Sequence, residues 1–514
     1  MPTLRAYLSG SNKVENMDKG TQTLRGSHHI LPIEPLQVGH ERQLLMDWHV
    51  VDDINGAVRK VHQPDKHPDN PVLAPEHPYE GTGFYSFGTV MRDSDTGKFR
   101  MWIPANDEFE RRHDKSRACE TGNYYESDDG LSWERPNLGL IERHGNKDNN
   151  IFVMSFTNNL SVLELPEHRR QRGRYGMIYC DALVGEAAKL IENPERSHHM
   201  RMFVAFSDDG IHFTPAPENP VWVGRTDCGN TLVYNPERDV FMYYRRATIN
   251  AGQIRRIAYS ESQDLITWTQ PINIIRREEN DPEFLYSLAV TPYHGVYLGL
   301  LMRLHTHPNS PHERLPDGRD HQMDTELCWS RDGVKWERHP EKPVFIDTSP
   351  AARGALDWGM AMGMNNIIEM DDHVRIYYGG REHLHGGYRL EADPMRSTIC
   401  LSTLRRDGFV SISADDDGGM MITKPLAYPG GTLRINAKTA GNGFINVAVR
   451  EGEGIRDGEW PPEFRFDQSV PFNGDSLDHV VTWKSAETLE AFPSKTLRLL
   501  FWLENADLYS FRFV

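Results

Sequence analysis

The strongest constraint on the fold is a short motif, Ser-x-Asp-Gly-x-x-Trp or a near copy of it, that recurs along the chain. Four copies begin at Ser127, Ser207, Ser262 and Ser330, and a degenerate fifth copy is Arg406-Asp407-Gly408-Phe409. Asp and Gly tolerate the positive φ angles of a tight turn, and the aromatic residue then begins the returning strand. Each copy therefore predicts a β-hairpin in which the aspartate is a structural turn residue.

Two further apolar strands precede each hairpin, as Asn230–Tyr234 and Val240–Tyr244 illustrate. The repeating unit is therefore strand, turn, strand, loop, strand, Asp-Gly turn, strand. Four antiparallel strands repeated five times predict a five-bladed β-propeller. The predicted blades cover residues 78–140, 145–218, 219–276, 281–346 and 350–412. Leu44–Val61 is expected to supply a closing strand or a lid.

The two ends of the chain differ from this repeating region. Residues 1–43 show little periodicity and predict an extended N-terminal arm, which leaves residues 44–412 for the propeller. Residues 413–514 alternate apolar and polar side chains, which predicts a β-sandwich of jelly-roll type. The predicted fold class is thus all-β, a propeller followed by a sandwich. Association into a homo-oligomer through the arm or the sandwich is left open.

Composition excludes several other classes of protein. The 514 residues include 57 Lys and Arg against 74 Asp and Glu, a formal charge of -17. This charge argues against nucleic-acid and anionic-membrane partners and favours a neutral or cationic ligand. The chain has no run of eighteen apolar residues, which excludes a membrane-spanning helix, and its start has no apolar signal region, so a cytoplasmic location is expected.

The five cysteines are widely spaced and form no CxxC pair. This pattern favours reduced, buried thiols over a disulfide scaffold or a structural zinc site. A second metal hypothesis comes from His305, His307 and His312, but a substrate-facing loop is the preferred interpretation of that Pro-rich stretch. The sequence carries no phosphate loop, dinucleotide-binding glycine motif or serine-nucleophile elbow, so no cofactor and no metal are predicted.

The chain resembles a known family at this point. The segment Asn70-Pro71-Val72-Leu73, the Asp-Gly hairpins and the trailing β-sandwich look like those of five-bladed propeller glycosidases of the invertase, levanase and arabinanase type. The resemblance covers about residues 44–514 and implies a glycoside hydrolase. The family's Asn-Asp-Pro-Asn-Gly, Arg-Asp-Pro and Glu-Cys motifs are missing, so its catalytic residues are not transferred to this chain.

Candidate catalytic residues instead follow from the architecture. Cleavage of a glycosidic bond needs at least two carboxyl groups, and propeller sites form where the innermost strands begin. Acidic residues precede these predicted strands in every blade: Glu80, Asp148, Asp227, Asp281 with Glu283, and Asp357. We assign Glu283 as the general acid, because neighbouring acids raise a carboxyl pKa, and Asp227 as the base or nucleophile. Asp357 or Glu80 would orient hydroxyls or stabilise the transition state.

Other side chains near these strand ends are expected to bind the substrate. Phe84, Tyr286 and Trp358 offer rings on which a sugar can stack. Basic and imidazole groups follow the second strands of three blades and would bind hydroxyls or a carboxylate, namely Arg245, Arg246, Arg303, Arg381, His383 and His385. Surface ion pairs with the excess acids are the alternative role. The predicted substrate-binding set also includes Glu80 and Asp281.

Three functional hypotheses follow from the sequence. The first is a hydrolase that cleaves an oligosaccharide by paired carboxylates at the propeller mouth. The second is a non-catalytic carbohydrate-binding propeller, which the absence of the family's acid motifs favours. The third is another sugar-active enzyme, a lyase, phosphorylase or transferase, and Arg245, Arg303 and Arg381 keep a phosphate site open. A carbohydrate is the expected ligand in all three, and fold alone does not choose between them.

Overall fold

Short antiparallel strands dominate the computed structural model of this chain. The structure describes residues 34–106, 120–155, 159–182, 200–222, 226, 229–249, 254–282, 284–306, 321–349, 355–385, 396–452 and 460–514. Most of the predicted N-terminal arm lies outside these ranges. The helical elements in the described part are single 3₁₀ segments: η2 (Pro78–Glu80), η3 (Glu167–Arg172), η7 (Pro462–Phe464) and η8 (Leu489–Ala491).

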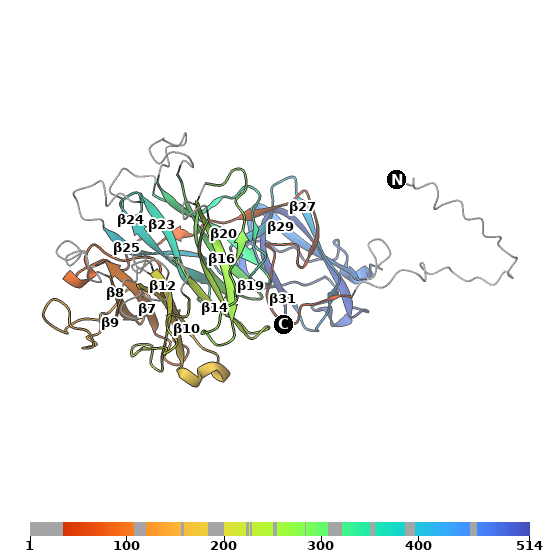
Figure 1. The fold of residues 1–514 in the computed structure, drawn as a ribbon. Helices are drawn as coiled ribbons and strands as arrows, with labels where there is room; N and C mark the ends of the chain where they lie inside the picture. Colours follow the sequence, from red (N-terminus) through yellow and green to blue (C-terminus); the bar gives the residue numbers. More distant parts are fainter. Residues whose placement is uncertain are drawn as a thin grey trace, which may run out of the picture.

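Five four-stranded antiparallel units form within the described residues, and these are the blades of the predicted propeller (Figure 1). Blade one has β6 (Thr89–Arg92), β7 (Phe99–Asn106), β8 (Glu120–Ser127) and β9 (Ile151–Ser155). Blade two has β10 (Leu160–Glu164), β11 (Tyr175–Ala182), β12 (Met200–Ser207) and β13 (Thr214–Pro215). Blade three has β14 (Thr231–Asn235), β15 (Val240–Ile249), β16 (Ile254–Ser262) and β17 (Ile272–Ile275).

The last two blades follow the same order. Blade four has β18 (Phe284–Tyr293), β19 (Val296–Leu304) and β20 (Met323–Ser330), with β21 (Glu337–Arg338) and β22 (Val344–Ile346) both paired to β20. Blade five has β23 (Met360–Glu369), β24 (His373–Arg381) and β25 (Ser397–Arg405). Its fourth strand is β5 (Asp65–Lys66), which pairs with β25. The ring is therefore closed by a strand that precedes blade one in the sequence.

Hydrogen bonds from small polar side chains join the inner strands of neighbouring blades. The amide of Val162 donates to Thr89 Oγ1 at 3.0 Å, and the amide of Leu232 donates to Ser161 Oγ at 3.0 Å. These bonds join blade one to blade two and blade two to blade three. They also fix which ends of the inner strands lie together.

The same kind of bond completes the ring. Thr231 Oγ1 donates to the carbonyl of Leu288 at 2.9 Å, and the amide of Ile367 donates to Thr291 Oγ1 at 2.9 Å. Asn365 of blade five then pairs with Thr89 of blade one. All five inner strands, β6, β10, β14, β18 and β23, are thus linked around one axis.

The four full copies of the Asp hairpin have the predicted structural role. The carboxylate of Asp129 accepts hydrogen bonds from Ser127 Oγ and from the amides of Leu131 and Ser132 at 2.7–2.9 Å. Asp209, Asp264 and Asp332 accept equivalent bonds in the other three copies. The backbone bond from Ser132, with the other donors, lowers the pKa of Asp129 despite its partial burial. The aspartates therefore fold back the third strand of each blade.

Three details differ from the sequence-based expectation. The fifth copy does not close a hairpin, because β26 (Val410–Ala414) pairs with β4 (Val58–Val61) and with a C-terminal strand instead of with β25. The stretch Leu44–Val61 does not close the propeller, because its strands join the second sheet. Blade one extends to β9, so Asp148 precedes an outer strand rather than the inner strand of blade two.

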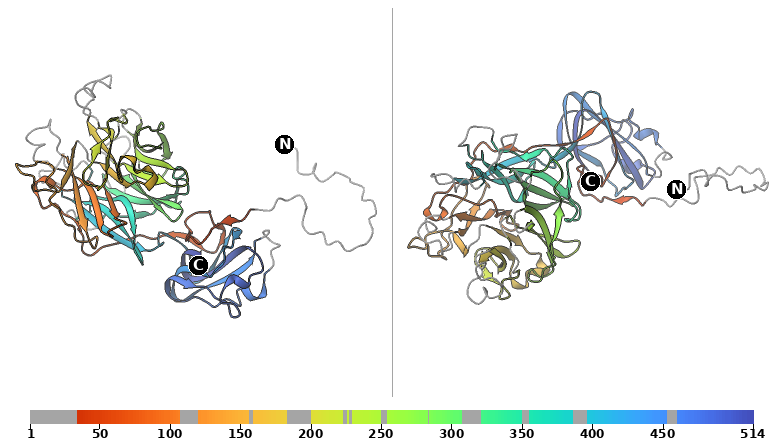
Figure 2. Two further views of the ribbon diagram at one scale, coloured as in Figure 1. Left: turned by 90° about the horizontal axis from the view of Figure 1, so that it is seen from below. Right: turned by 45° about the horizontal axis from the view of Figure 1, so that its top comes forward.

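A second sheet of ten strands forms a body beside the blades, coloured blue for the most part in Figure 2. Two long strands run through it, β29 (Leu433–Glu451) and β31 (Thr496–Phe513). The others are β1 (Leu36–Gln37), β2 (Gln43–Leu44), β3 (Val51–Asn55), β4, β26, β27 (Gly419–Thr423), β28 (Leu426–Ala427) and β30 (Asp475–Val480). It encloses its own apolar core, which includes Leu499 and Phe501. The jelly-roll type and the domain limits 1–43, 44–412 and 413–514 stay predictions.

Asp407, the aspartate of the fifth copy, links the two bodies instead of closing a hairpin. Its carboxylate accepts hydrogen bonds from Tyr293 of blade four at 2.7 Å and from Ser510 of β31 at 2.8 Å. Its side chain is 1% exposed. None of the helices in the described part has the length and apolar character that crossing a membrane requires.

We expect Asp129→Ala to lower the free energy of unfolding by about 1–3 kcal/mol, because two backbone amides and a hydroxyl lose a charged acceptor. Asp128→Ala in the same hairpin is the matched control, since this carboxylate is exposed and has only a 3.7 Å contact with Lys98. Urea unfolding of the two variants measures the difference. Equal stability of the two variants would contradict the structural role.

Candidate active site

Side chains from four blades gather around Tyr286, near the start of β18. The Arg246 and Arg255 guanidinium carbons lie 4.8 and 4.7 Å from the centre of its ring. His385, which follows β24, packs edge-on with ring centres 5.3 Å apart and has Nε2 3.3 Å from the tyrosine hydroxyl. Phe87 of the first blade stacks on the same ring at 6.4 Å. Blades one, three, four and five thus meet at this tyrosine, and we call this set the propeller mouth.

Arg381 ends β24 and lies beside the same group. Its guanidinium carbon is 5.0 Å from the ring centre of Tyr85, and its carbonyl accepts the amide of Gly359 at 2.9 Å. The residue is 9% exposed. Its charge acts on His385 together with those of Arg246 and Arg255. The mouth is therefore both aromatic and strongly cationic.

His385 is neutral in this environment. Burial is the main cause, and the positive charges of Arg255, Arg381 and Arg246 act in the same direction, lowering the pKa of His385 to about 3. A neutral imidazole has one nitrogen that donates and one that accepts a hydrogen bond. Such a group can bind a sugar hydroxyl, and it carries no charge of its own at neutral pH.

The two acids assigned to the chemistry, Asp227 and Glu283, lie outside the described residues. Their neighbours in sequence lead to the mouth. Phe284, which follows Glu283, has its ring centre 5.3 Å from the guanidinium carbon of Arg255. Gly229 packs so closely on Ser287 that a Cβ there would lie 2.1 Å from the serine Cβ. The catalytic roles of both acids stay predictions.

Asp357, the third predicted catalytic residue, is engaged in an ion pair. Its Oδ2 lies 2.6 Å from Lys66 Nζ and accepts a hydrogen bond from Tyr378 at 3.0 Å. The side chain of Asp357 is 4% exposed. Because Lys66 belongs to β5, this pair joins the closing strand to blade five. The contacts are typical of a structural ion pair, and a catalytic role for Asp357 stays a prediction.

Glu80 is also saturated by partners. Its side chain is fully buried, one oxygen accepts Tyr125 Oη at 2.6 Å and Arg135 Nε at 2.8 Å, and the other accepts two backbone amides, of Glu76 and His77. Burial of an ionised carboxylate requires such pairing. These bonds anchor η2 against blade one and leave neither oxygen without a partner.

Asp281 and Arg303 belong to one buried ion network in blade four. Arg338 forms two bonds to the Asp281 carboxylate, at 2.6 and 2.7 Å, and also contacts Glu326. Arg303 forms two bonds to Asp324, at 2.7 and 3.1 Å, and a third to Glu326. The network explains why these charges are tolerated away from water. It leaves Arg303 tied to protein carboxylates.

His305 also contacts this network, and its contact bears on the metal hypothesis. Its Nε2 lies 2.9 Å from Asp324. Burial alone would raise the pKa of Asp324, but the bond with His305 and the charge of Arg303 outweigh it and hold the pKa well below its usual value. His307 and His312 lie outside the described residues. Within the described ranges no cluster of three or more His, Cys, Asp or Glu side chains is arranged to hold a metal.

The remaining predicted binding residues lie near the mouth with varied surroundings. Arg245 is buried with its guanidinium carbon 5.0 Å from the Trp222 ring centre, and burial lowers its pKa. Trp358 is half-buried, and its carbonyl accepts Gln322 Nε2 at 3.0 Å. The backbone of His383 lies against Gly359, where a Cβ would be 1.9 Å from its carbonyl oxygen. Their roles in substrate binding stay predictions.

Sequence reasoning named Tyr286, Arg381 and His385 but missed Arg255 and Phe87. Arg255 lies near the start of β16, paired in register with Thr248 on β15. The signal was present, because the third strand of this blade begins Ile254-Arg255-Arg256 and its first residues lie at the same end as the inner-strand starts. The basic residues predicted to bind the substrate all follow second strands, whereas Arg255 begins a third strand.

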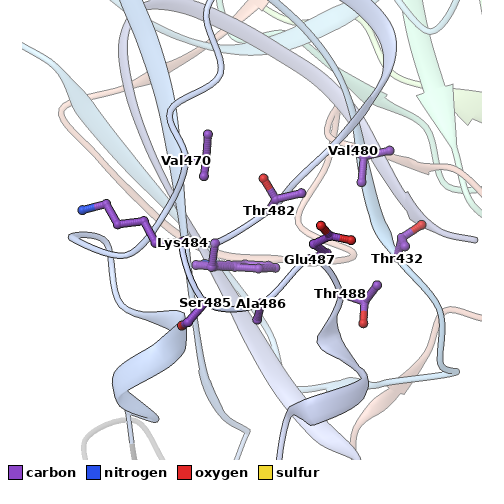
Figure 3. A pocket seen from close by; sticks show the side chains of 10 residues that line it. Thr432, Val470, Val480, Thr482, Lys484, Ser485, Ala486, Glu487 and Thr488 are labelled. Carbon is purple, nitrogen blue, oxygen red and sulfur yellow. The ribbon is translucent and has the colours of Figure 1, made fainter.

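A separate pocket of about 560 Å³ lies on the second sheet (Figure 3). Its lining is mostly Thr, Ser, Lys and Glu side chains around Trp483. Trp483 is 3% exposed, and its indole nitrogen donates to the carbonyl of Val447. The ring therefore belongs to the core of this sheet and offers little surface for a sugar. This pocket contains none of the predicted site residues.

No family model matches the chain, and no curated protein matches it. Solved structures similar to it include a β-1,2-mannobiose phosphorylase from Listeria innocua, 10% identical over 67% of this chain and 97% of that one with a TM-score of 0.43. Another is the catalytic domain of Coprinopsis cinerea GH62 α-L-arabinofuranosidase, 10% identical over 66% of this chain and 97% of that one with a TM-score of 0.42. A third is Bombyx mori GH32 β-fructofuranosidase, 11% identical over 81% of this chain and 89% of that one with a TM-score of 0.37. Likeness at these values assigns no activity to this chain.

We expect Arg303→Met to lower the free energy of unfolding by about 3–5 kcal/mol, because Asp324 and Glu326 would lose a buried counter-charge. Arg172→Met is the control, since its pair with Glu218 is exposed, and it should leave the urea midpoint unchanged. A stable Arg303→Met protein with only weaker substrate binding would contradict the structural role.

We expect the His385 imidazole to stay neutral from pH 8 to pH 4, whereas an ordinary histidine protonates near pH 6.5. An NMR titration, with the His385 signal assigned by its loss in His385→Gln, measures this. Between pH 6.5 and 3 the unfolded chain binds a proton here and the folded chain does not, so this group lowers stability on acidification. A midpoint near 6.5 would show that the mouth is hydrated and weakly charged.

Proposed function

We propose that this protein is a sugar-active enzyme that hydrolyses a glycosidic bond at the propeller mouth. The observation that carries the proposal is the convergence of four blades on Tyr286, at the end where the inner strands begin. Aromatic rings with hydrogen-bonding groups around them suit a pyranose or furanose ring, which has apolar faces and a polar rim. Phe284 and Gly229, which are close to Glu283 and Asp227 in sequence, pack against Arg255 and Ser287.

In this proposal the two carboxyl groups divide the chemistry. Glu283 protonates the leaving oxygen as the glycosidic bond breaks, and Asp227 either activates a water molecule or attacks the anomeric carbon. Phe284, which is half-buried, would support the face of the sugar.

The propeller architecture gives these residues a rigid frame. Each inner strand is fixed to its neighbours by the side-chain hydrogen bonds of Thr89, Ser161, Thr231 and Thr291. Groups at the starts of these strands are therefore held at set positions around the axis. Catalysis by two carboxyl groups depends on such fixed separation.

We expect at least one aryl glycoside from a panel of pyranosides and furanosides to be hydrolysed, with kcat/KM falling at least a hundredfold in Glu283→Gln and in Asp227→Asn. Asp148→Asn is the matched control, because this exposed carboxylate precedes outer strand β9. Activity that survives both active-site changes would contradict the assignment. Sugar binding by thermal shift without turnover of any glycoside would favour the non-catalytic binding propeller.

A further inference from the structure

Three positive charges at the mouth share one small region. The guanidinium carbons of Arg246 and Arg255 both lie within 5 Å of the Tyr286 ring centre, and Arg381 is close enough to depress the pKa of His385. Like charges in a partly dehydrated site repel each other by several times more than in water. The repulsion between Arg255 and Arg381 therefore favours a compensating negative charge beside them.

Two of these arginines have no protein counter-ion in the described part of the chain. No carboxylate there lies within ion-pair distance of Arg255 or Arg381, and the buried Nε of Arg381 has no hydrogen-bond partner. The contacts shown for Arg255 and Arg381 are with the rings of Phe284, Tyr286 and Tyr85. Their donor groups are therefore available to a ligand.

Two buried arginines of blade four show a different arrangement. Arg303 binds Asp324 and Glu326, and Arg338 binds Asp281 and Glu326. Each of these guanidinium groups is saturated by carboxylates from its own blade. Arg303 and Arg338 are thus paired with carboxylates inside blade four, whereas Arg255 and Arg381 have no carboxylate partner among the described residues.

We propose that the propeller mouth is an oxyanion site, in which Arg255 and Arg381 bind the carboxylate of an acidic sugar or an inorganic phosphate. Guanidinium groups present fixed pairs of donors that match both oxyanions. This inference rests on the proposed function, because it names the class of substrate or co-substrate for the same site. The two sources share one chemistry, and the experiment below separates them.

The overall charge of -17 does not oppose such a ligand. The net negative charge favours a neutral or cationic ligand only if every charged group of the chain acts equally on the ligand. At physiological ionic strength the field of exposed charges is screened over about 8 Å, whereas partly buried arginines act on a ligand in direct contact. The local arrangement therefore decides the preference at the mouth.

Titration calorimetry with inorganic phosphate, galacturonate and glucuronate, against galactose and glucose as neutral partners, tests the proposal. We expect at least one oxyanion to bind tenfold more tightly than its neutral partner. Arg255→Met and Arg381→Met should each weaken that binding at least tenfold, and Arg255→Lys should restore part of it. Arg172→Met, which changes an exposed arginine, should bind as the wild type does. Thermal unfolding confirms that each variant is folded.

Turnover assays identify the source of the oxyanion. Faster cleavage of aryl uronides than of the matching neutral glycosides assigns it to the substrate. If phosphate is the partner, the reaction is phosphorolysis in place of hydrolysis: a phosphate oxygen bonds to the anomeric carbon as the glycosidic bond breaks, the leaving oxygen takes a proton, and a sugar 1-phosphate is released. Oxyanion binding without turnover of any glycoside would refute the proposed hydrolase and keep this inference. Turnover of neutral glycosides with no oxyanion binding would refute this inference alone.

Discussion

A ring of hydrogen bonds from small polar side chains joins the inner strands of the propeller, and the mouth depends on it. Thr89, Ser161, Thr231 and Thr291 each use a hydroxyl to meet the backbone of the next inner strand. Backbone contacts between the inner strands of the described part are few: Asn365 pairs with Thr89, and the amide of Leu160 donates to the carbonyl of Phe87 just before β6. Small hydroxyl side chains therefore join neighbouring inner strands, whereas a continuous ladder of backbone hydrogen bonds joins the strands within a blade. They set where β18 begins and hence where Tyr286 lies.

Arginine has two distinct roles in this molecule. In blade four, Arg303 and Arg338 neutralise buried carboxylates, so their removal costs stability. At the mouth, Arg255 and Arg381 lie against aromatic rings and keep donor groups for a ligand. Residue type and burial do not separate these roles, because Arg303 and Arg381 are 6% and 9% exposed. The identity of the neighbours separates them.

Local sequence signals predicted the blades well, because an Asp-Gly turn and its flanking strands lie within a few residues of one another. The four hairpins at Ser127, Ser207, Ser262 and Ser330 are confirmed on that basis. The prediction of a fifth hairpin was wrong, because the strand that follows this copy, β26, pairs with β4 and β31, which are far away in sequence. The pairing of β5 with β25, which closes the propeller, likewise joins strands far apart in sequence, so a local sequence pattern does not predict it.

The candidate site was harder to predict for a related reason. Strand-start acids look alike in sequence, yet Asp357 pairs with Lys66 and Asp281 with Arg338, which are 291 and 57 residues away. Conversely, Arg255 is marked in the sequence only by its place at the start of a third strand, and its importance comes from lying beside Tyr286 of the next blade. Position at a strand start was predictable, whereas the partner of each charge required the folded chain.

The central claim is that sugar chemistry takes place at the propeller mouth. A crystal structure of the protein soaked with a mixture of neutral sugars, uronates and phosphate tests it most directly. Our account predicts ligand density against Tyr286, with an oxyanion in contact with Arg255 or Arg381. Density confined to the pocket beside Trp483 on the second sheet, with the mouth filled only by water, would contradict it.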